Sequence, residues 1–473
     1  MEHLIALLTT LWRLFQNKKN ASHELDWLCG QNIEVGGTKM YLKRLKLHNF
    51  KCFEDLDMEF HDNLTVIVGS NGAGKTTILE GAAIAVSSLF VKMDGLTGRK
   101  IDRTQAHLKS YSVGSTKDVQ EQYPVVVSAI AKDNQFLSGE GIEWTRSLSS
   151  STGQTLFGDA KDITSLGVEL QQKVRNGDTK ILLPLFAYYG TGRLWDYHRE
   201  KQSDVFETNN RLNGYLNCMD GTANIKLMMN WFLKMTVQKY QNQELNLGDI
   251  PELEAVYSAM ETCYRRITGC DYVKMQYNMG TKALDVAYKD ASGNIMRMPI
   301  NQLSDGYKST ISLVADIAYR MAVLNPQLLG SVCSQTDGIV LIDEVDLHLH
   351  PEWQQQILAD LTAIFPKVQF IVTTHAPAVI SSVEQECVRV LHNNQIDLPA
   401  LETYGRDTNG ILRAVMGVSE RQPKTMEQFS NFYKLIDSGD MEKAEQLLAE
   451  LEEQYPDDPE VGAMRVQFDL EQI

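Results

Sequence analysis

A phosphate-binding loop is the first candidate site in the chain. Residues 69–76 read G-S-N-G-A-G-K-T, which fits the pattern G-x-x-x-x-G-K-[ST] without deviation. In such a loop the backbone N–H groups face a β-phosphate, and the helix that follows adds the positive end of its dipole. Lys75 is expected to neutralise phosphate charge, and the Thr76 hydroxyl is expected to ligate Mg²⁺. The predicted ATP contacts in this loop are Ser70, Asn71, Gly72, Ala73, Gly74, Lys75, Thr76 and Thr77.

Two carboxylates, Asp343 and Glu344, follow the apolar run G-I-V-L-I. Asp343 is expected to hold Mg²⁺ through water, and Glu344 is expected to polarise the attacking water as a general base. The alternative is a strand that merely ends in acidic loop residues. The phosphate loop earlier in the chain favours the catalytic interpretation.

His375 ends the next apolar run, V-T-T-H. In a parallel sheet the carboxyl ends of neighbouring strands meet at one edge, so His375 is predicted to lie beside the phosphate loop and to sense the γ-phosphate. The alternative is an ordinary structural histidine at a strand end.

A second anion site is predicted where L-S-D-G-Y-K-S opens a helix. The Ser304 hydroxyl, the Gly306 N–H and the helix dipole are suited to bind a phosphate, with Asp305 between them. Two phosphate-binding loops and one nucleotide site predict a dimer in which each loop completes the partner's site. The alternative is a plain N-cap serine followed by a turn glycine.

The elements around these residues are expected to alternate between strands and helices. Apolar residues at Leu45 and Leu47, and again at Leu56, Met58 and Phe60, predict two strands in residues 41–60. Further strands are predicted at 64–69, 181–195, 338–343 and 369–375, helices at 75–90, 222–268 and 351–365, and a β-meander at 271–300. The pattern is typical of the α/β class.

Composition places the chain in a reducing cytoplasm without a membrane partner. No apolar run approaches the roughly 18 residues of a membrane span, and no secretory signal is recognisable. The seven cysteines have irregular spacing, which predicts neither a disulfide framework nor a zinc site. The net charge is −16, and −9 of it lies in residues 417–473. The acidity is therefore mostly a property of the C-terminal tail.

These motifs together resemble the ABC-type ATPases of the SMC/RecF/OLD group. The resemblance covers roughly residues 41–395, with Asp305 and Tyr307 where the commonest signature has Gly and Gln. It implies an ABC-type head, a mixed β-sheet with flanking helices, that sandwiches ATP and Mg²⁺ between two copies. It also implies a D-loop role for Asp346 near the dimer seam, and it makes Arg193 in Y-Y-G-T-G-R a candidate contact to a phosphate or to the partner head.

The resemblance leaves two motifs without an assigned function. No glutamine is identifiable for the Q-loop. The H-x-H formed by His348 and His350 is a candidate metal pair, but packing is the favoured account, because the OLD-like branch normally has L-H-P at this place.

The expected domain boundaries follow from the same comparison. They are an N-terminal extension (1–40), the first lobe of the head with the phosphate loop (41–195), a helical insert (196–270), the second lobe with signature, Walker B and switch histidine (271–400), and a C-terminal segment with an acidic helical tail (401–473). The tail resembles one tetratricopeptide unit, with Gly439 at the turn and Ala444 between the helices. One such unit is expected to dock on the body, a second copy or another protein, and the alternative is a helical hairpin that seals the core.

The group contains several branches, and the Septu antiphage ATPases (PtuA-like), including those that accompany retrons, resemble the whole chain best. The chain lacks heptads for a long coiled coil, and the 98 residues after His375 do not resemble a Toprim nuclease domain. The resemblance therefore implies an ATPase that controls a separate HNH endonuclease, PtuB, and assembles into oligomers. Nucleic acid, or a retron reverse transcriptase with its DNA, is a further candidate partner.

Two hypotheses compete with this one. The first is a RecF-like repair clamp that binds duplex DNA when it holds ATP. The second is an OLD-like ATP-dependent nuclease with a degenerate active site.

Overall fold

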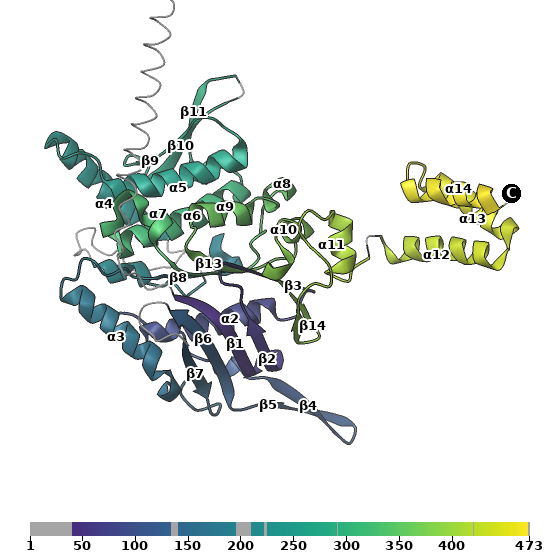
Figure 1. The fold of residues 1–473 in the computed structure, drawn as a ribbon, viewed down its shortest axis with the longest axis horizontal. Coiled ribbons are helices and arrows are strands. Elements are labelled where there is room, and N and C mark those ends of the chain that lie inside the picture. The colour runs from purple at the N-terminus through teal and green to yellow at the C-terminus, as the bar shows by residue number, and fades with distance from the viewer. Residues whose placement is uncertain are drawn as a thin grey trace, which may run out of the picture.

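The computed structural model describes residues 40–133, 141–194, 210–221, 225–290, 292–419 and 421–471. The predicted extension at 1–40 lies outside the described residues except for Met40. Figure 1 shows an α/β body and, apart from it, a tail of three helices. The predicted α/β class, with a mixed β-sheet, flanking helices and a helical tail, is confirmed.

A six-stranded sheet forms the centre of the body. Its order is β15-β14-β3-β13-β12-β8, and all of its strands are parallel except β15. The strands are β3 (Leu64–Gly69), β8 (Leu185–Tyr189), β12 (Gly338–Ile342), β13 (Val368–Thr373), β14 (Val388–His392) and β15 (Gln395–Asp397). β3, β8, β12 and β13 are buried along their whole length, as their continuous apolar sequences predict.

A second, antiparallel sheet covers the phosphate-loop helix α2 (Lys75–Val86). Its order is β2-β1-β6-β7, from β1 (Met40–Phe50), β2 (Phe53–Glu59), β6 (Val125–Asp133) and β7 (Ile142–Leu148). The Trp144 indole of β7 donates to the Ala85 carbonyl of α2 at 3.0 Å, and a Cβ on Gly81 of α2 would lie 2.7 Å from the Leu47 side chain of β1. α2 is therefore clamped between the two sheets. The two strands predicted in residues 41–60 are confirmed.

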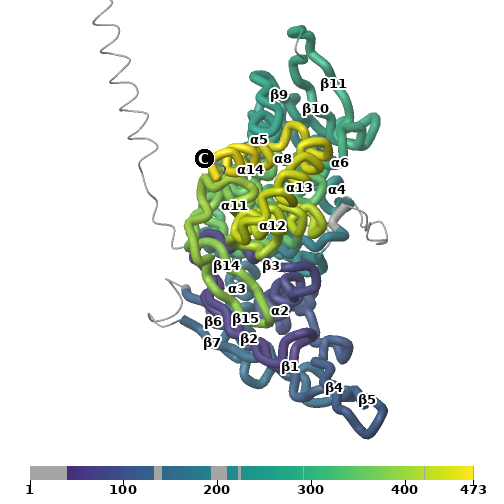
Figure 2. Tube along the Cα trace, turned by 90° about the vertical axis from the view of Figure 1, so that its right-hand side faces the viewer, coloured from purple at the N-terminus to yellow at the C-terminus, as the bar shows by residue number. Residues whose placement is uncertain are grey.

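Helices lie on the other face of the central sheet (Figure 1), and the predicted meander packs against two of them, α5 (Pro251–Thr268) and α4 (Ile225–Glu244). The other helices are α6 (Asp305–Leu324) and α9 (Ile357–Ile364), and the meander is β9 (Val273–Asn278), β10 (Ala283–Lys289) and β11 (Ile295–Pro299). Figure 2 shows β10 and β11 at one end of the molecule. At the other end is an exposed hairpin that sequence reasoning missed, β4 (Leu108–Val113) with β5 (Thr116–Glu121).

The C-terminal tail forms a core of its own. Helices α12 (Pro423–Ser438), α13 (Met441–Gln454) and α14 (Pro459–Glu471) lie side by side (Figure 2) and bury Phe432, Leu448 and Phe468 among them. Gly439 ends α12 at φ 74°, and Ala444 is fully buried, as predicted. The third helix was not predicted. The tail does not seal the core of the body, because the two apolar clusters are separate.

Two general properties of the described residues bear on the sequence predictions. Six of the seven cysteines fall within them, and all six are free thiols. None of the helices in the described part of the chain has both the length and the apolar character needed to cross a membrane.

Candidate nucleotide site

The phosphate loop, residues 69–76, joins β3 to α2, and its glycines allow close backbone approach. Gly74 has φ 111°, and a Cβ there would lie 2.6 Å from both the Cys52 sulfur and the Phe53 ring. Lys75 as a residue is 6% exposed, and its ammonium donates to the carbonyls of Gly69 at 2.9 Å and Ser70 at 3.1 Å. Burial lowers the pKa of Lys75, against the opposing effect of Asp343. The loop thus holds a desolvated cation across its mouth.

A chain of hydroxyl and carboxylate groups links the phosphate loop to two neighbouring strands. The Thr76 hydroxyl donates to Asp343 Oδ2 at 2.8 Å, and the Thr373 hydroxyl donates to Asp343 Oδ1 at 2.6 Å. The carboxylate of Asp343 is thereby oriented from both sides. This arrangement follows from the ladder, in which Ile342 pairs with Val372 and Thr373 pairs with Ile67.

Glu344 lies at the same sheet edge in a backbone conformation that is uncommon for its type. Its φ is 47°, and its N–H donates to the Thr373 hydroxyl at 2.8 Å. Non-glycine residues in this left-handed region cluster at functional sites when the surrounding structure holds them there. Thr373, which sequence reasoning did not single out, therefore positions both predicted acidic residues. Its place at the end of β13 was the available signal.

His375 follows β13 and lies within electrostatic reach of Lys75. Burial, together with the positive charge of Lys75, lowers the pKa of the imidazole. The neighbouring Thr374 hydroxyl donates to Asp346 at 2.6 Å. The structure therefore brings the predicted phosphate loop, Walker B, D-loop and switch residues to one edge of the sheet.

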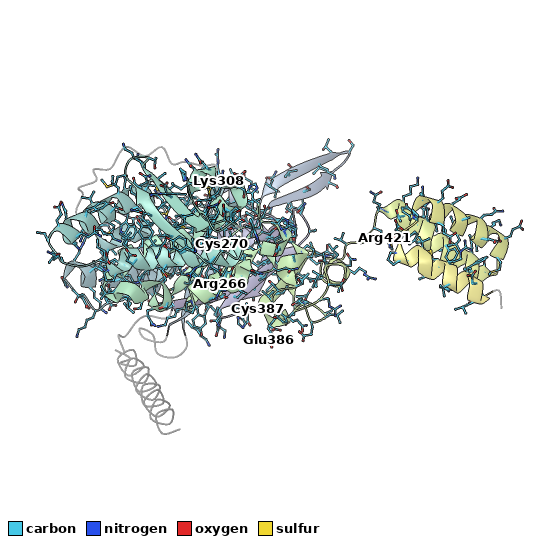
Figure 3. The ribbon with its side chains drawn as sticks, turned by 90° about the horizontal axis from the view of Figure 1, so that it is seen from above. Arg266, Cys270, Lys308, Glu386, Cys387 and Arg421 are labelled. Carbon is cyan, nitrogen blue, oxygen red and sulfur yellow. The ribbon has the colours of Figure 1, made fainter. Side chains whose placement is uncertain are left out.

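The signature loop, residues 303–309, leads into α6, whereas the phosphate loop leads into α2. Ser304 occupies the N-cap position with extended backbone and is exposed, but its side chain makes no capping hydrogen bond. A Cβ on Gly306 would lie 2.6 Å from the His348 carbonyl oxygen. Lys308, labelled in Figure 3, forms an exposed ion pair with Asp305 at 2.6 Å. The loop is therefore packed against the D-loop, and its serine hydroxyl makes no capping hydrogen bond to the helix that follows.

Tyr307, one of the two departures from the common signature, has a packing role. Its ring lies 4.4 Å from the Trp353 ring and 5.7 Å from the Tyr264 ring, centroid to centroid. An aromatic residue at this place joins the signature helix to α5 and to the short helix α8 (Pro351–Gln354).

Two remaining predictions have different outcomes. The side chain of Arg193 lies outside the described residues, so its phosphate contact stays a prediction. His348 and His350 are both exposed, but the His350 ring lies 6.1 Å from the Trp353 ring, centroid to centroid, and Leu349 between the two histidines is buried, which agrees with packing. Among the described residues no group of three His, Cys, Asp or Glu side chains could hold a metal ion.

The residues at the sheet edge fit ATP and Mg²⁺. The Thr76 hydroxyl and the Asp343 carboxylate are hard oxygen donors of the kind Mg²⁺ prefers. Lys75, desolvated and bonded only by neutral carbonyls among the hydrogen bonds described, suits a phosphate oxygen. When bound, Mg²⁺ would neutralise phosphate charge between these groups.

Comparison with known proteins agrees with this geometry. A family model described as an AAA domain matches residues 44–267, and one described as an AAA ATPase domain matches residues 156–380. The chain is 26% identical to "Retron Vc95 probable ATPase" of Vibrio cholerae serotype O1 biovar El Tor, over 82% of this chain and 80% of that protein. It is 25% identical to "Retron Ec83 probable ATPase" of Escherichia coli, over 92% and 88%.

A third relative and a solved structure complete the comparison. "Septu protein PtuA" of Bacillus thuringiensis is 23% identical over 85% of this chain and 91% of that protein. An SMC head bound to the C-winged helix domain of ScpA aligns with 76% of this chain at 14% identity and a TM-score of 0.46. The predicted resemblance to this group of ATPases is confirmed by the family models and the relatives. Residues 44–380 thus match AAA-type ATPase domains, and the chain is an ATPase that is similar over most of its length to retron ATPases and to Septu PtuA.

Proposed function

We propose that the chain is the ATP-driven switch subunit of an antiphage defence complex. Two copies close on ATP, and the closed state changes how a separate HNH endonuclease is presented. The observation that carries the proposal is that five predicted site residues meet at one sheet edge: Lys75, Thr76, Asp343, Glu344 and His375. Ser304 lies at the start of a different helix, and its hydroxyl makes no capping hydrogen bond there.

Each group in the site has a proposed role in hydrolysis. Lys75 binds the β- and γ-phosphates, and Asp343, held by Thr76 and Thr373, orients the Mg²⁺ site. Glu344 accepts a proton from the attacking water, and neutral His375 donates to the γ-phosphate. Ser304 and the N–H of Gly306 from a second copy bind the same phosphate from the opposite side.

The defence role is supported by the names of the relatives, and a separate nuclease is proposed because the described elements after His375 are strands and helices of an ATPase body and its tail. Retron and Septu proteins align with this chain over most of both lengths, and the elements after His375 are accounted for by two strands of the central sheet and by helices. The proposed partners are a second copy, the endonuclease, and nucleic acid or a retron reverse transcriptase with its DNA. The proposed location is the cytoplasm.

The substitution Glu344→Gln tests the catalytic part of this proposal. The amide keeps the shape of the side chain but cannot accept the proton, so turnover is expected to fall by about 10²- to 10⁴-fold while ATP binding is retained. ATP should then convert the variant to a stable dimer, measured by light scattering after size-exclusion chromatography. Glu352→Gln, which changes an exposed acid on α8, is the matched control. Turnover equal to that of the unsubstituted chain would refute the assignment of Glu344.

The partner is tested by purification of the chain from its native host. A stoichiometric HNH endonuclease is expected in the complex. Steeply salt-dependent binding of duplex DNA by the lone chain would instead favour a repair clamp, and DNA cleavage by the pure chain would favour a nuclease in this chain.

A further inference from the structure

Three side chains far apart in the sequence form a buried polar cluster beneath the nucleotide site. They are Tyr189 at the end of β8, and Asp316 and Arg320 one turn apart on the signature helix α6. The Tyr189 hydroxyl and the Arg320 Nε both donate to Asp316 Oδ2, each at 2.7 Å. All three residues are at most 2% exposed. We call this group the Tyr189–Asp316–Arg320 cluster.

The cluster is charged and lies in the core. Burial alone would lower the pKa of Arg320, but the adjacent Asp316 carboxylate more than reverses this, so the guanidinium stays charged. Arg320 also donates to the carbonyls of Gly214 at 2.9 Å and Leu216 at 3.0 Å. Asp316 Oδ1 has no hydrogen-bond partner in the described structure. A buried ion pair contributes little net stability compared with apolar residues of the same volume, so stability alone is a weak explanation for it.

The cluster lies on a short path between two parts of the proposed ATP site. Asp316 is eleven residues after Asp305 at the start of α6, about 16 Å along the helix axis. At the other end of the path, the carbonyl of Tyr189 accepts a hydrogen bond from the N–H of Asp343 at 2.8 Å. One residue, Tyr189, therefore binds the signature helix through its side chain and the Walker B aspartate through its backbone.

The neighbouring residue on β8 faces the other side of the sheet. Successive strand residues point to opposite faces, and the Tyr188 ring lies 5.3 Å from the guanidinium of Arg99, which in turn donates to the Met219 carbonyl at 3.0 Å. β8 is thus fixed on both faces at the point where it meets Asp343.

We propose that Tyr189, Asp316 and Arg320 are positioning residues of the ATPase, which couple the signature helix α6 to the strand edge that carries Asp343. When the signature loop engages a phosphate, α6 moves as a unit and the cluster carries that displacement to β8 and β12. The cluster touches neither nucleotide nor water. It sets the position of the groups that do.

Tyr189→Phe is the variant that tests the coupling with the least disturbance. It removes one hydroxyl and leaves the Asp316–Arg320 pair intact. The expected result is a fall in kcat of about tenfold with the ATP dissociation constant changed by less than about twofold, because nucleotide contacts are untouched. Tyr215→Phe is the matched control, since Tyr215 is equally buried and its hydroxyl donates to the Pro184 carbonyl at 2.8 Å and, among the described residues, to no group of α6.

The control separates positioning from simple stabilisation. Both variants lose one buried hydrogen bond, so their melting temperatures should fall by similar amounts, but the control should keep kcat. An equal loss of kcat in the two variants, or no loss in Tyr189→Phe, would overturn the proposal. If Tyr189→Phe does not fold, Arg320→Lys, which keeps the charge but loses the fork of donors, takes its place with the same expectations.

A double-mutant cycle with Ser304→Ala tests the path itself. If the two substitutions act independently, the factor by which kcat falls in the double variant equals the product of the two single-variant factors. If the cluster transmits the state of the signature loop, the factor in the double variant will differ from that product. Multiplying effects would overturn the coupling. The inference rests on the ATPase role proposed above, and the two fail differently: absence of turnover in the unsubstituted chain would refute the proposed function, whereas an active chain with an equally active Tyr189→Phe variant would refute the coupling alone.

Discussion

At the scale of single residues, the site is organised around charges that burial and neighbours control. The Lys75 ammonium is held by two carbonyls rather than by a carboxylate among its described hydrogen bonds, while Asp343 accepts from two hydroxyls. The Lys75 ammonium and the Asp343 carboxylate are therefore not bonded to each other in the described structure. The ammonium is suited to bind a phosphate oxygen, and the carboxylate is suited to bind Mg²⁺. His375 is close enough to Lys75 for that charge to disfavour the imidazolium.

The influence of Lys75 on His375 gives a prediction. Lys75→Met removes the positive charge, so the pKa of His375, measured by NMR titration, should rise, whereas Lys308→Met on the exposed signature loop should leave it unchanged.

Between the folded pKa and 6.5 the unfolded chain binds more protons at this site, so His375 destabilises the unsubstituted fold as pH falls through that window. A His375 pKa that does not respond to Lys75→Met would show that burial alone sets it.

At the scale of elements, close backbone approaches fix the loops against one another. The signature loop packs on the D-loop because Gly306 lacks a Cβ, and the phosphate loop packs on Cys52 and Phe53 for the same reason at Gly74. The ring of Tyr307 on Trp353 strengthens the first of these contacts. The start of α6 is therefore in direct contact with the D-loop.

Gly306→Ala tests this packing. The added methyl would meet the rigid His348 carbonyl oxygen at 2.6 Å, so the signature loop must move. We expect a loss of about 1–3 kcal/mol in unfolding free energy, measured by denaturant titration, and a lower kcat. Gly330→Ala, where nothing lies within 4 Å of the new methyl, should be close to neutral. Equal behaviour of the two variants would contradict the close approach.

At the scale of the whole molecule, the acidic tail is a separate unit. Its helices bury their own core, and Arg421, labelled in Figure 3, pairs with Asp458 at 2.5 Å and with Glu460 at 3.2 Å within the tail. The tail is set apart from the α/β body in Figure 1. Of the docking sites predicted for the tail, a second copy or another protein therefore fits this arrangement (Figure 1) better than the body of the same chain.

Short sequence motifs were enough to predict the phosphate loop and the acidic and histidine residues at the strand ends. The spacing of the phosphate loop requires a strand before it and a helix after it, and D-E and H after apolar runs place their side chains at one sheet edge. The Tyr189–Asp316 bond joins residues 127 positions apart, so no local pattern reveals it. Asp316 and Arg320 at i and i+4 in an apolar helix were the one available signal. The hairpin β4–β5 was missed because both strands are polar and exposed, which removes the alternation that marks a half-buried strand.

The central claim is that each ATP site is built from two copies of the chain, and a complementation assay tests it most directly. Lys75→Ala disables the phosphate loop, and Ser304→Arg blocks the signature loop, so each variant alone should hydrolyse almost no ATP. In an equimolar mixture half of the dimers are mixed and each holds one intact site, so about a quarter of the unsubstituted activity should return. A mixture as inactive as its components, or a Ser304→Arg variant that is fully active alone, would contradict the composite site.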